Sequence, residues 1–257
     1  SDFEIAKLLY SMAGRFVIFW FKNKLPYFRL DSNGFLPAVF DFKHECIAST
    51  TTLIDELYNL IEDIEVKNIF SFPKKRGFLP FGLTNYKDVI RLLPNHVLNL
   101  KTWVTERTWP SIEKCNNKAD NQNEIVKIVD IIAHYVKNHV RAIIDGGKGI
   151  IYLSGGHDSR MVLAACNHFK ERITCESLKK KGNPDSLIAA KVASHVGVRH
   201  RIIDVIPTPR QEVYNWLHRT GYTFYDPLTE LAETARINDR NYHIMDGTGA
   251  EITRASN

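Results

Sequence analysis

A glycine-rich segment that directly follows a short apolar run constrains the fold of this chain more than any other feature. The run Gly149-Ile-Ile-Tyr-Leu153 has the length and residue types of a buried strand, and Ser154-Gly-Gly-His-Asp-Ser159 follows it. Adjacent glycines permit a tight turn, and Asp158 is a residue type common at helix starts. The sequence therefore predicts a strand, a tight turn and a helix, in that order.

A strand-to-helix turn of this kind can bind an anion. Its backbone N–H groups can point inward, and the N-terminus of the helix adds a partial positive charge. Ser154 and Ser159 bring hydroxyl groups, and Asp158 can hold a metal ion that carries phosphate charge. These features indicate a pyrophosphate ligand, and hence ATP with Mg²⁺. The alternative is an ordinary strand-to-helix connection, and the segment is neither a Walker motif nor a dinucleotide fingerprint.

From residue 149 onward, apolar runs and amphipathic segments alternate. The predicted strands are 150–153, 172–176, 201–205 and 242–245, and the predicted helices are 157–169, 183–197, 209–220 and 227–238. Such alternation predicts an α/β fold with a parallel, doubly wound sheet, in which ligands bind beyond the carboxyl ends of the strands. A second glycine-rich turn, Asp246-Gly-Thr-Gly-Ala-Glu251, follows the last predicted strand at this same end.

The first part of the chain has a different pattern, which predicts a β-rich domain. The predicted elements are strands 15–21, 26–30, 36–41, 45–49 and 91–100, the last with a turn at Pro94-Asn95, and a helix 54–64. The polar stretch 116–123 predicts a linker before a long helix 124–144. One face of that helix carries Ile125, Ile128, Val129, Ile132, Val136 and Val140.

Composition excludes several classes of protein. The 257 residues carry a net charge of +5 and 44% hydrophobic residues, with no apolar stretch near the roughly 18 residues of a membrane span. The basic clusters 74–76 and 179–181 are short and lack interleaved aromatic residues, so we expect no nucleic-acid or membrane partner. The four cysteines show no C-x-x-C spacing, which favours free thiols and a cytoplasmic location.

The motif Ser-Gly-Gly-x-Asp-Ser after a strand resembles the pyrophosphate loop (PP-loop) of the ATP pyrophosphatase superfamily. With Arg160 directly after it, the motif resembles that of the asparagine-synthetase-like branch. This resemblance implies an adenine nucleotide α-hydrolase-like fold. Gly247-Thr-Gly-Ala-Glu251 is similar to the Gly-x-Gly-Ala-Asp-Glu segment of the family. Here Glu251 stands where the family has Asp, and Ile252 stands where it has Glu. The geometry of a metal site at Glu251 therefore stays open, and the alternative is an ordinary glycine turn.

Other matches fall between the two loops. Thr174-Cys-Glu-Ser177 resembles the family segment that follows the second strand and borders the adenine. Asp185, followed by an Ala-rich helix, is similar to the family's Asp, but it is equally typical of a residue that complements a helix dipole. We interpret His200 as a structural histidine at a strand end. His157 and Arg160 are either phosphate or substrate contacts or ordinary surface residues.

The N-terminal half resembles the later part of an Ntn-type glutamine amidotransferase-like domain. The matching pieces are 1–4, 13–17, 30–37, 48–50 and 91–98. The resemblance thus implies a partial amidotransferase-like domain over 1–115 and the N-terminal part of a PP-loop synthetase domain over 116–257. It also implies that the glutaminase nucleophile precedes Ser1 and that the synthetase domain continues beyond Asn257.

The resemblance implies an ATP-dependent, amide-forming ligase that adenylates a carboxylate, releases pyrophosphate and passes the acyl group to ammonia or an amine. The expected catalytic residues are Asp158 and Arg160, the expected nucleotide contacts are Ser154, Gly155, Gly156, His157, Ser159, Glu176, Gly247 and Gly249, and the expected Mg²⁺ ligands are Asp158 and Glu251. The expected partners are a second copy of the chain, or a C-terminal segment or chain that carries the acceptor-binding helices of the family. The alternatives are another superfamily member, such as a tRNA-modifying enzyme, and a non-catalytic nucleotide-binding or interaction module.

Overall fold

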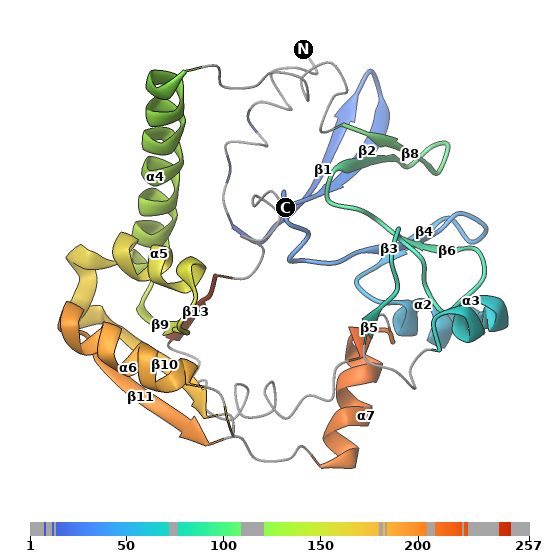
Figure 1. The fold of residues 1–257 in the computed structure, drawn as a ribbon. Coiled ribbons are helices and arrows are strands. Elements are labelled where there is room, and N and C mark those ends of the chain that lie inside the picture. The colour runs from blue at the N-terminus through green and yellow to red at the C-terminus, as the bar shows by residue number, and fades with distance from the viewer. Residues whose placement is uncertain are drawn as a thin grey trace. The chain divides into compact units, whose positions relative to one another are not determined.

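The computed structural model describes residues 8, 12, 14–71, 77–108, 121–179, 182, 184–204, 209–222, 224–225 and 242–247 (Figure 1). The chain forms two compact units. The first comprises 1–117 and 209–227, and the second comprises 118–208 and 228–257. Antiparallel sheets build the first unit and a parallel sheet builds the second, so the fold is mixed α/β, as the sequence predicts.

The described part of the first unit contains three small sheets. One has the order β1-β2-β7-β8, one has the order β4-β3-β6, and a third pairs β12 with β5. Their bounds are β1 Val17–Lys22, β2 Leu25–Leu30, β3 Val39–Asp41, β4 Cys46–Ala48, β5 Gly77–Phe78, β6 Val89–Arg91, β7 His96–Asn99, β8 Val104–Arg107 and β12 Phe224–Tyr225. Asn23 and Lys24 form the predicted turn between β1 and β2, with φ of 49° and 66°.

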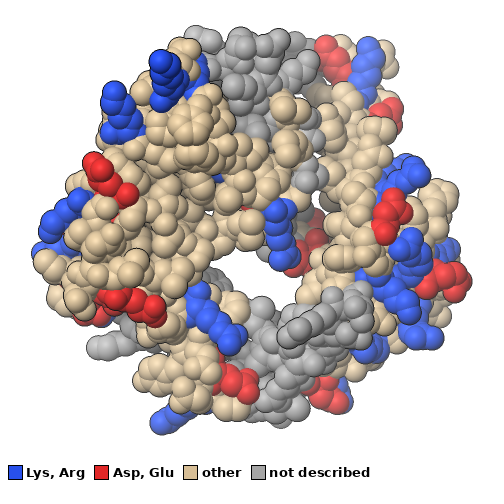
Figure 2. Space-filling view, turned by 180° about the vertical axis from the view of Figure 1, so that it is seen from behind, with Lys and Arg blue, Asp and Glu red and all other residues tan. Residues whose placement is uncertain are grey.

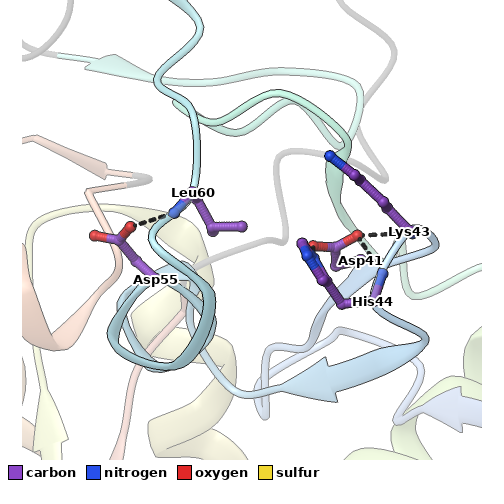
Figure 3. Close-up of polar contacts among 5 residues, drawn as sticks. All are labelled: Asp41, Lys43, His44, Asp55 and Leu60. Atoms are coloured by element: carbon purple, nitrogen blue, oxygen red, sulfur yellow. Dashed lines mark hydrogen bonds and ion pairs between the residues drawn. The ribbon is translucent and has the colours of Figure 1, made fainter.

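The described residues of the first unit include the helices α2 Thr51–Tyr58, α3 Ile64–Ile69 and α7 Arg210–Arg219. The prediction of one helix over 54–64 is wrong, because the chain leaves the helix at Asn59, which has a left-handed φ of 51°. The Asp55 carboxylate then accepts a 2.8 Å hydrogen bond from the Leu60 N–H (Figure 3). Asp63 starts α3 by accepting a hydrogen bond from the Val66 N–H.

Asp41 fixes another turn of the first unit, between β3 and β4. Its buried carboxylate accepts hydrogen bonds from the Lys43 and His44 amides and from His44 Nδ1, the last at 2.6 Å (Figure 3). These bonds lower the pKa of the Asp41 carboxyl, although burial, the largest single effect, opposes them. The predicted strand 91–100 is also wrong as one element, because β6 and β7 belong to different sheets.

In the second unit, four parallel strands have the order β11-β10-β9-β13. Their bounds are β9 Lys148–Tyr152, β10 Ile173–Lys179, β11 Arg199–Asp204 and β13 Tyr242–Met245. The helical elements are α4 Gln122–Asp145, α5 His157–Ala165, the 3₁₀ helix η2 Asn167–Arg172 and α6 Asp185–Val196. Chain order runs from β9 outward to β11 and then returns to the other side of β9 with β13.

One face of this sheet carries the core of the unit. Ile151, Cys175 and Met245 lie in register on adjacent strands and are buried. Helices α4, α5 and α6 add apolar side chains to them, and Figure 1 shows α6 lying across β10 and β11. Gly149 packs closely against this core, since a methyl carbon added to it would lie 2.6 Å from Met245 Cε and 2.7 Å from Ile144 Cδ1, and the ends of both side chains would have to move.

The long helix α4 packs over only part of its length. Val140 and Ile144 are buried, but its N-terminal turns extend away from the sheet in Figure 1. The predicted apolar face is therefore largely exposed there, at Ile125, Ile128, Val129 and Ile132. Asn121 begins the helix by accepting a hydrogen bond from the Glu124 N–H, so the helix includes the end of the predicted linker 116–123.

Several boundaries differ from the predictions. Helix α5 ends at Ala165 rather than at residue 169, and β10 continues to Lys179. Thr174-Cys-Glu-Ser177 thus lies inside the strand and does not follow it. Gly197 ends α6 in the left-handed conformation, as predicted. The predicted helix 227–238 lies outside the described residues, and among those described no helix is long and apolar enough to cross a membrane.

Candidate functional site

The candidate site lies at the carboxyl ends of β9 and β13. These strands are neighbours in the sheet, and the chain order reverses between them. In open parallel sheets, the loops that follow two such strands diverge and leave a crevice where ligands bind. The predicted glycine-rich loop, residues 153–156, follows β9, and Asp246 and Gly247 follow β13. The topology therefore brings both predicted loops to one place.

Gly247 lies directly against the first turn of α5. A methyl carbon added to it would lie 2.7 Å from Asp158 Cβ, 2.7 Å from Ser159 N and 2.8 Å from the Asp158 carbonyl carbon. Any larger residue would therefore push against backbone as well as side chain. Only glycine lets the end of β13 approach the N-terminus of α5 this closely.

Hydroxyl groups brace the loop from within. The Ser159 Oγ accepts a 3.1 Å hydrogen bond from the Ser154 N–H and lies 3.1 Å from the Ser154 Oγ. The Gly156 N–H in turn donates to the Ser154 Oγ over 3.1 Å. Ser159 is buried, so its hydroxyl holds the loop closed on the helix start. The structure thus brings together the two serines that were predicted to donate to a ligand. In the structure their hydroxyl groups form hydrogen bonds within the loop and hold its shape.

A carboxylate already contacts the loop backbone. The Gly155 N–H donates a 3.2 Å hydrogen bond to Asp185 Oδ1, and Asp185 is the first residue of α6. The sequence allowed two roles for Asp185, a helix-start residue and a ligand contact. In the structure Asp185 is the first residue of α6 and also contacts the loop. Because a carboxylate oxygen is an anionic acceptor, this contact shows that the loop amide is directed towards an oxyanion.

Arg160 and His157 lie on the first turn of α5, and Arg160 folds back on the loop. Its Nε donates a 3.1 Å hydrogen bond to the Gly156 carbonyl, and its Nη2 lies 3.3 Å from His157 Nδ1. Arg160 is half-buried and His157 is exposed. Both side chains are therefore close to the loop and accessible to a ligand bound there.

Besides Asp185, two acidic residues lie near the loop: Asp158, in the first turn of α5, and Asp246, which is exposed after β13. The predicted partners Gly249 and Glu251 lie outside the described residues. Within the described ranges, no group of three or more His, Cys, Asp or Glu side chains could hold a metal ion. A metal site involving Asp158 thus needs ligands from elsewhere, and Mg²⁺ characteristically takes these from phosphate and water.

Glu176 lies in β10 beside the loop, and its side chain is 1% exposed. Its Oε1 is paired with Arg201 Nε and Nη2 on β11, whereas its Oε2 is buried without a hydrogen bond. Its carbonyl accepts a 2.8 Å hydrogen bond from the Leu153 N–H. Glu176 therefore connects β10 to the start of the loop, and a nucleotide contact by this residue stays a prediction.

Ser177 and His200 form a support for the loop that sequence reasoning missed. The Ser177 hydroxyl donates a 2.6 Å hydrogen bond to the Leu153 carbonyl and lies 2.9 Å from His200 Nε2. Burial lowers the pKa of His200, which fits the interpretation of this residue as structural. No sequence signal could have found the pair, because it depends on strand register and on the position of the loop.

Charged side chains of both signs lie on the surface of the molecule. Figure 2 shows Lys and Arg side chains interspersed with Asp and Glu, separated by broad uncharged areas. Within the described part of the face drawn, no single sign of charge dominates a patch. At the loop itself, the N-terminus of α5 contributes a partial positive charge.

Comparison with curated proteins finds no match to the chain. Comparison with protein-family models finds one over residues 129–234, which is less than half of the 257 residues. This range contains most of α4, the strands β9 to β11, the loop 153–156 and the pair of Gly155 with Asp185. Over residues 129–234, the chain is similar to the asparagine synthase family.

Proposed function

We propose that this protein is an ATP-dependent ligase that forms amide bonds. In this reaction a carboxylate is adenylated and pyrophosphate is released, and ammonia or an amine then attacks the acyl carbon and displaces AMP. The observation that carries the proposal is the Gly155 N–H, which precedes the N-terminus of α5 and donates to the carboxylate of Asp185; both residues lie within the range similar to asparagine synthase. The similarity supports a ligase at family level.

The described residues fit the triphosphate of ATP. Glycines at 155 and 156 leave the loop amides free of side chains, and Gly155 N–H already contacts a carboxylate. Ser154 and Ser159 hold those amides in position. Asp158 stands at the helix start, where it would share Mg²⁺ with phosphate oxygens and with Glu251, its predicted partner. ATP would supply the adenylyl group and the pyrophosphate leaving group.

The residues of the loop would act by stabilising charge. Amides fixed in advance cost no reorganisation when negative charge develops on a leaving group, and the α5 N-terminus adds its partial charge. Arg160 would exchange its bond with the Gly156 carbonyl for a phosphate or carboxylate, for which its planar guanidinium is suited. Ser177 and Glu176 would hold the base of the loop through Leu153.

The finer assignments belong to the same proposal. The strand order and the Pro184–Gly197 helix support a doubly wound, adenine nucleotide α-hydrolase-like second domain. The antiparallel sheets of the first unit support an Ntn-type, amidotransferase-like domain. Glutamine, ammonia or a substrate amine would then be the nitrogen source, and the activated molecule is a small-molecule or peptide carboxylate.

Calorimetric titration of the chain with Mg²⁺-ATP and with Mg²⁺-pyrophosphate tests this proposal. We expect both to bind and Asp158→Asn to weaken both by about tenfold or more, which corresponds to about 1.4 kcal/mol. Asp130→Asn, on the exposed side of α4, is the matched control and should bind like the wild type. If Asp158→Asn binds Mg²⁺-ATP unchanged, the proposed role of the loop is wrong.

A second candidate function, a non-catalytic nucleotide-binding module, has one observation in its favour. The loop amides are already occupied, Gly155 by Asp185 and Gly156 by Ser154. Asp185→Ala would free the Gly155 amide and remove a negative charge. If the site is built for phosphate, this variant should bind metal-free pyrophosphate more tightly. If neither the wild type nor Asp185→Ala binds any phosphate compound, a non-catalytic interaction module with a degenerate nucleotide site is the better description.

A further inference from the structure

The N-terminal half of α4 carries a group of exposed apolar side chains that the loop site does not use. Each of these seven residues exposes between 43% and 56% of its area, and they are Ile125, Val126, Ile128, Val129, Ile131, Ile132 and Tyr135. Together they are called the α4 surface below. Monomeric proteins rarely expose a contiguous apolar patch larger than a few hundred Å², and larger patches mark interaction sites. The role of the α4 surface is independent of the proposed function.

The opposite side of the same turns has the composition of a solvent-facing side. The polar residues there, all exposed, are Lys127, Asp130, His134, Asn138 and Arg141. Asn138 Nδ2 lies 2.9 Å from His134 Nε2, so these side chains contact one another along the helix. A helix with one solvated polar side normally buries its apolar side. The α4 surface is therefore the side that requires a cover.

The α4 surface continues the face by which α4 packs on its own sheet. Val140 and Ile144 are buried in the core of the second unit, and Val136 packs against that core. Ile132 and Ile125 precede Val136 on the same side of the helix, because residues three and four apart share a face. The C-terminal turns of this single apolar side are covered by the sheet, whereas its N-terminal turns remain exposed and extend away from the sheet (Figure 1).

The spacing of the exposed residues is that of a helix that packs along a second helix. Ile125, Ile128, Ile132 and Tyr135 follow one another in steps of three and four, with Val129 beside them. This repeat allows the side chains of two helices to interdigitate. None of the five residues is charged, so a second apolar helix face fits them and a charged partner does not.

We propose that the α4 surface is the contact between two copies of this chain, whose α4 helices pair antiparallel. In a two-fold pair the same surface of each copy covers the other, so both exposed faces are buried at once. The C-terminal turns of each helix lie on their own sheet. An antiparallel partner therefore meets only the exposed N-terminal turns, and the two sheets lie at opposite ends of the pair. Ile128 of one copy then lies opposite Ile132 of the second copy, and Ile125 opposite Tyr135.

The exposed area is sufficient for such a dimer. From the exposed fractions, the α4 surface presents roughly 500–700 Å² per copy, so a pair would bury about 1,000–1,400 Å² in total. Stable interfaces between proteins bury about 1,200–2,000 Å². The contact lies at the lower end of this range, and we therefore expect a dimer that dissociates on dilution.

Sedimentation equilibrium of the full 257-residue chain tests this proposal. We expect twice the mass of one chain, with a shift towards the single chain on dilution. Ile128→Asp should raise the dissociation constant by about a hundredfold or more, because two carboxylates would lie close together in an apolar contact. Lys127→Asp introduces the same side chain on the polar side of the same turn. This variant is the matched control, and its dissociation constant should be close to that of the wild type.

Spin labels test the antiparallel orientation without any change to the α4 surface. Single labels at Lys127→Cys or Arg141→Cys lie on the polar side, in a background with Cys46→Ser and Cys115→Ser; the remaining Cys166 and Cys175 are buried. At a rise of 1.5 Å per residue and with the two-fold axis level with residue 130, the two labels at 127 lie about 9 Å apart along the helix axis and those at 141 about 33 Å apart.

We therefore expect a much longer distance between labels at 141 than between labels at 127. Equal distances at the two sites, or a dimer that Ile128→Asp leaves intact, would overturn the proposal. A monomeric chain would overturn it as well. If that monomer also loses melting temperature with Ile128→Asp, another part of the same chain covers the α4 surface.

Discussion

Replacing Gly247 by Ala should separate the end of β13 from the N-terminus of α5. The added carbon would lie 2.7 Å from both Asp158 Cβ and Ser159 N. Carbon atoms in contact lie about 3.5 Å apart or more, so the two elements must move apart by about 0.8 Å. Two of the three close atoms are backbone, and no side-chain rotation can relieve the clash. Overpacking of this kind costs about 1–3 kcal/mol of unfolding free energy.

This cost converts into a measurable shift in melting temperature. A change of 1 kcal/mol shifts the melting temperature of a chain of this size by about 2–4 °C. Gly247→Ala should therefore lower it by roughly 2–12 °C, measured by circular dichroism or calorimetry. Because the same displacement moves Asp246 and the first turn of α5, Mg²⁺-ATP binding should weaken as well.

Gly156→Ala is the matched control within the same site. Gly156 has φ of −74° and ψ of 162°, which any residue adopts, and an added methyl would meet only Ser154 Oγ, at 3.2 Å. Its unfolding free energy should stay within about 1 kcal/mol of the wild type, while the methyl group obstructs phosphate at the loop. Equal melting temperatures for Gly247→Ala and Gly156→Ala would refute the argument from close approach.

Three further predictions concern stability and reactivity. Burial raises the pKa of Cys166 to about 12 and that of Cys175 to about 11, so both thiols should resist iodoacetamide in the native protein and react only on unfolding, as mass spectrometry would show. Burial lowers the pKa of His200 from 6.5, so below pH 6.5 the unfolded state binds more protons than the folded state. The free energy of unfolding, measured with urea, should therefore fall as the pH drops from 6.5 towards the lowered pKa. His200→Gln should flatten this slope, and an unchanged slope would contradict the assignment. Arg201→Met should lower the free energy of unfolding by about 1–3 kcal/mol, because Glu176 would stay buried without a cation. The loss stays in this range because Arg201 is half-exposed and the ion pair is partly screened by solvent. An unchanged urea midpoint would contradict a stabilising role of the pair.

Local patterns predicted those parts of the fold that local interactions determine. The strand-turn-helix at 149–165 and the strand 242–245 were found because a buried parallel strand is a short apolar run bounded by turn residues. Gly197 marked the end of α6 because the left-handed conformation favours glycine. In each case a few adjacent residues carry the whole signal.

The wrong predictions arose where a side chain acts at a distance along the chain. The apolar pattern of 54–64 continues past Tyr58, but the Asp55 carboxylate takes the Leu60 amide and ends the helix. The run 91–100 reads as one strand, although its two halves pair in different sheets. Hydrophobic periodicity predicts neither the end of α2 nor the change of sheet, because both depend on which group each backbone N–H and C=O bonds to.

The candidate site divides in the same way. Its glycines were visible in the sequence because no other residue gives bare amides in a tight turn. The pairs Glu176–Arg201 and Ser177–His200 were not, because they require the register between β10 and β11. The helix 209–220 was predicted correctly, but its grouping with the first unit depends on contacts such as Thr51 with Gly221.

Asp185 shows how such a site sets its own selectivity. Its carboxylate and a phosphate oxygen need the same Gly155 N–H, so a bound phosphate must displace it. Once displaced, a carboxylate beside phosphate oxygens is repelled unless a cation lies between them. The proposed loop should therefore favour phosphate that carries Mg²⁺ over metal-free phosphate. The carboxylate that holds the Gly155 amide thus also disfavours metal-free phosphate, and this role becomes visible only when the position of α6 is known.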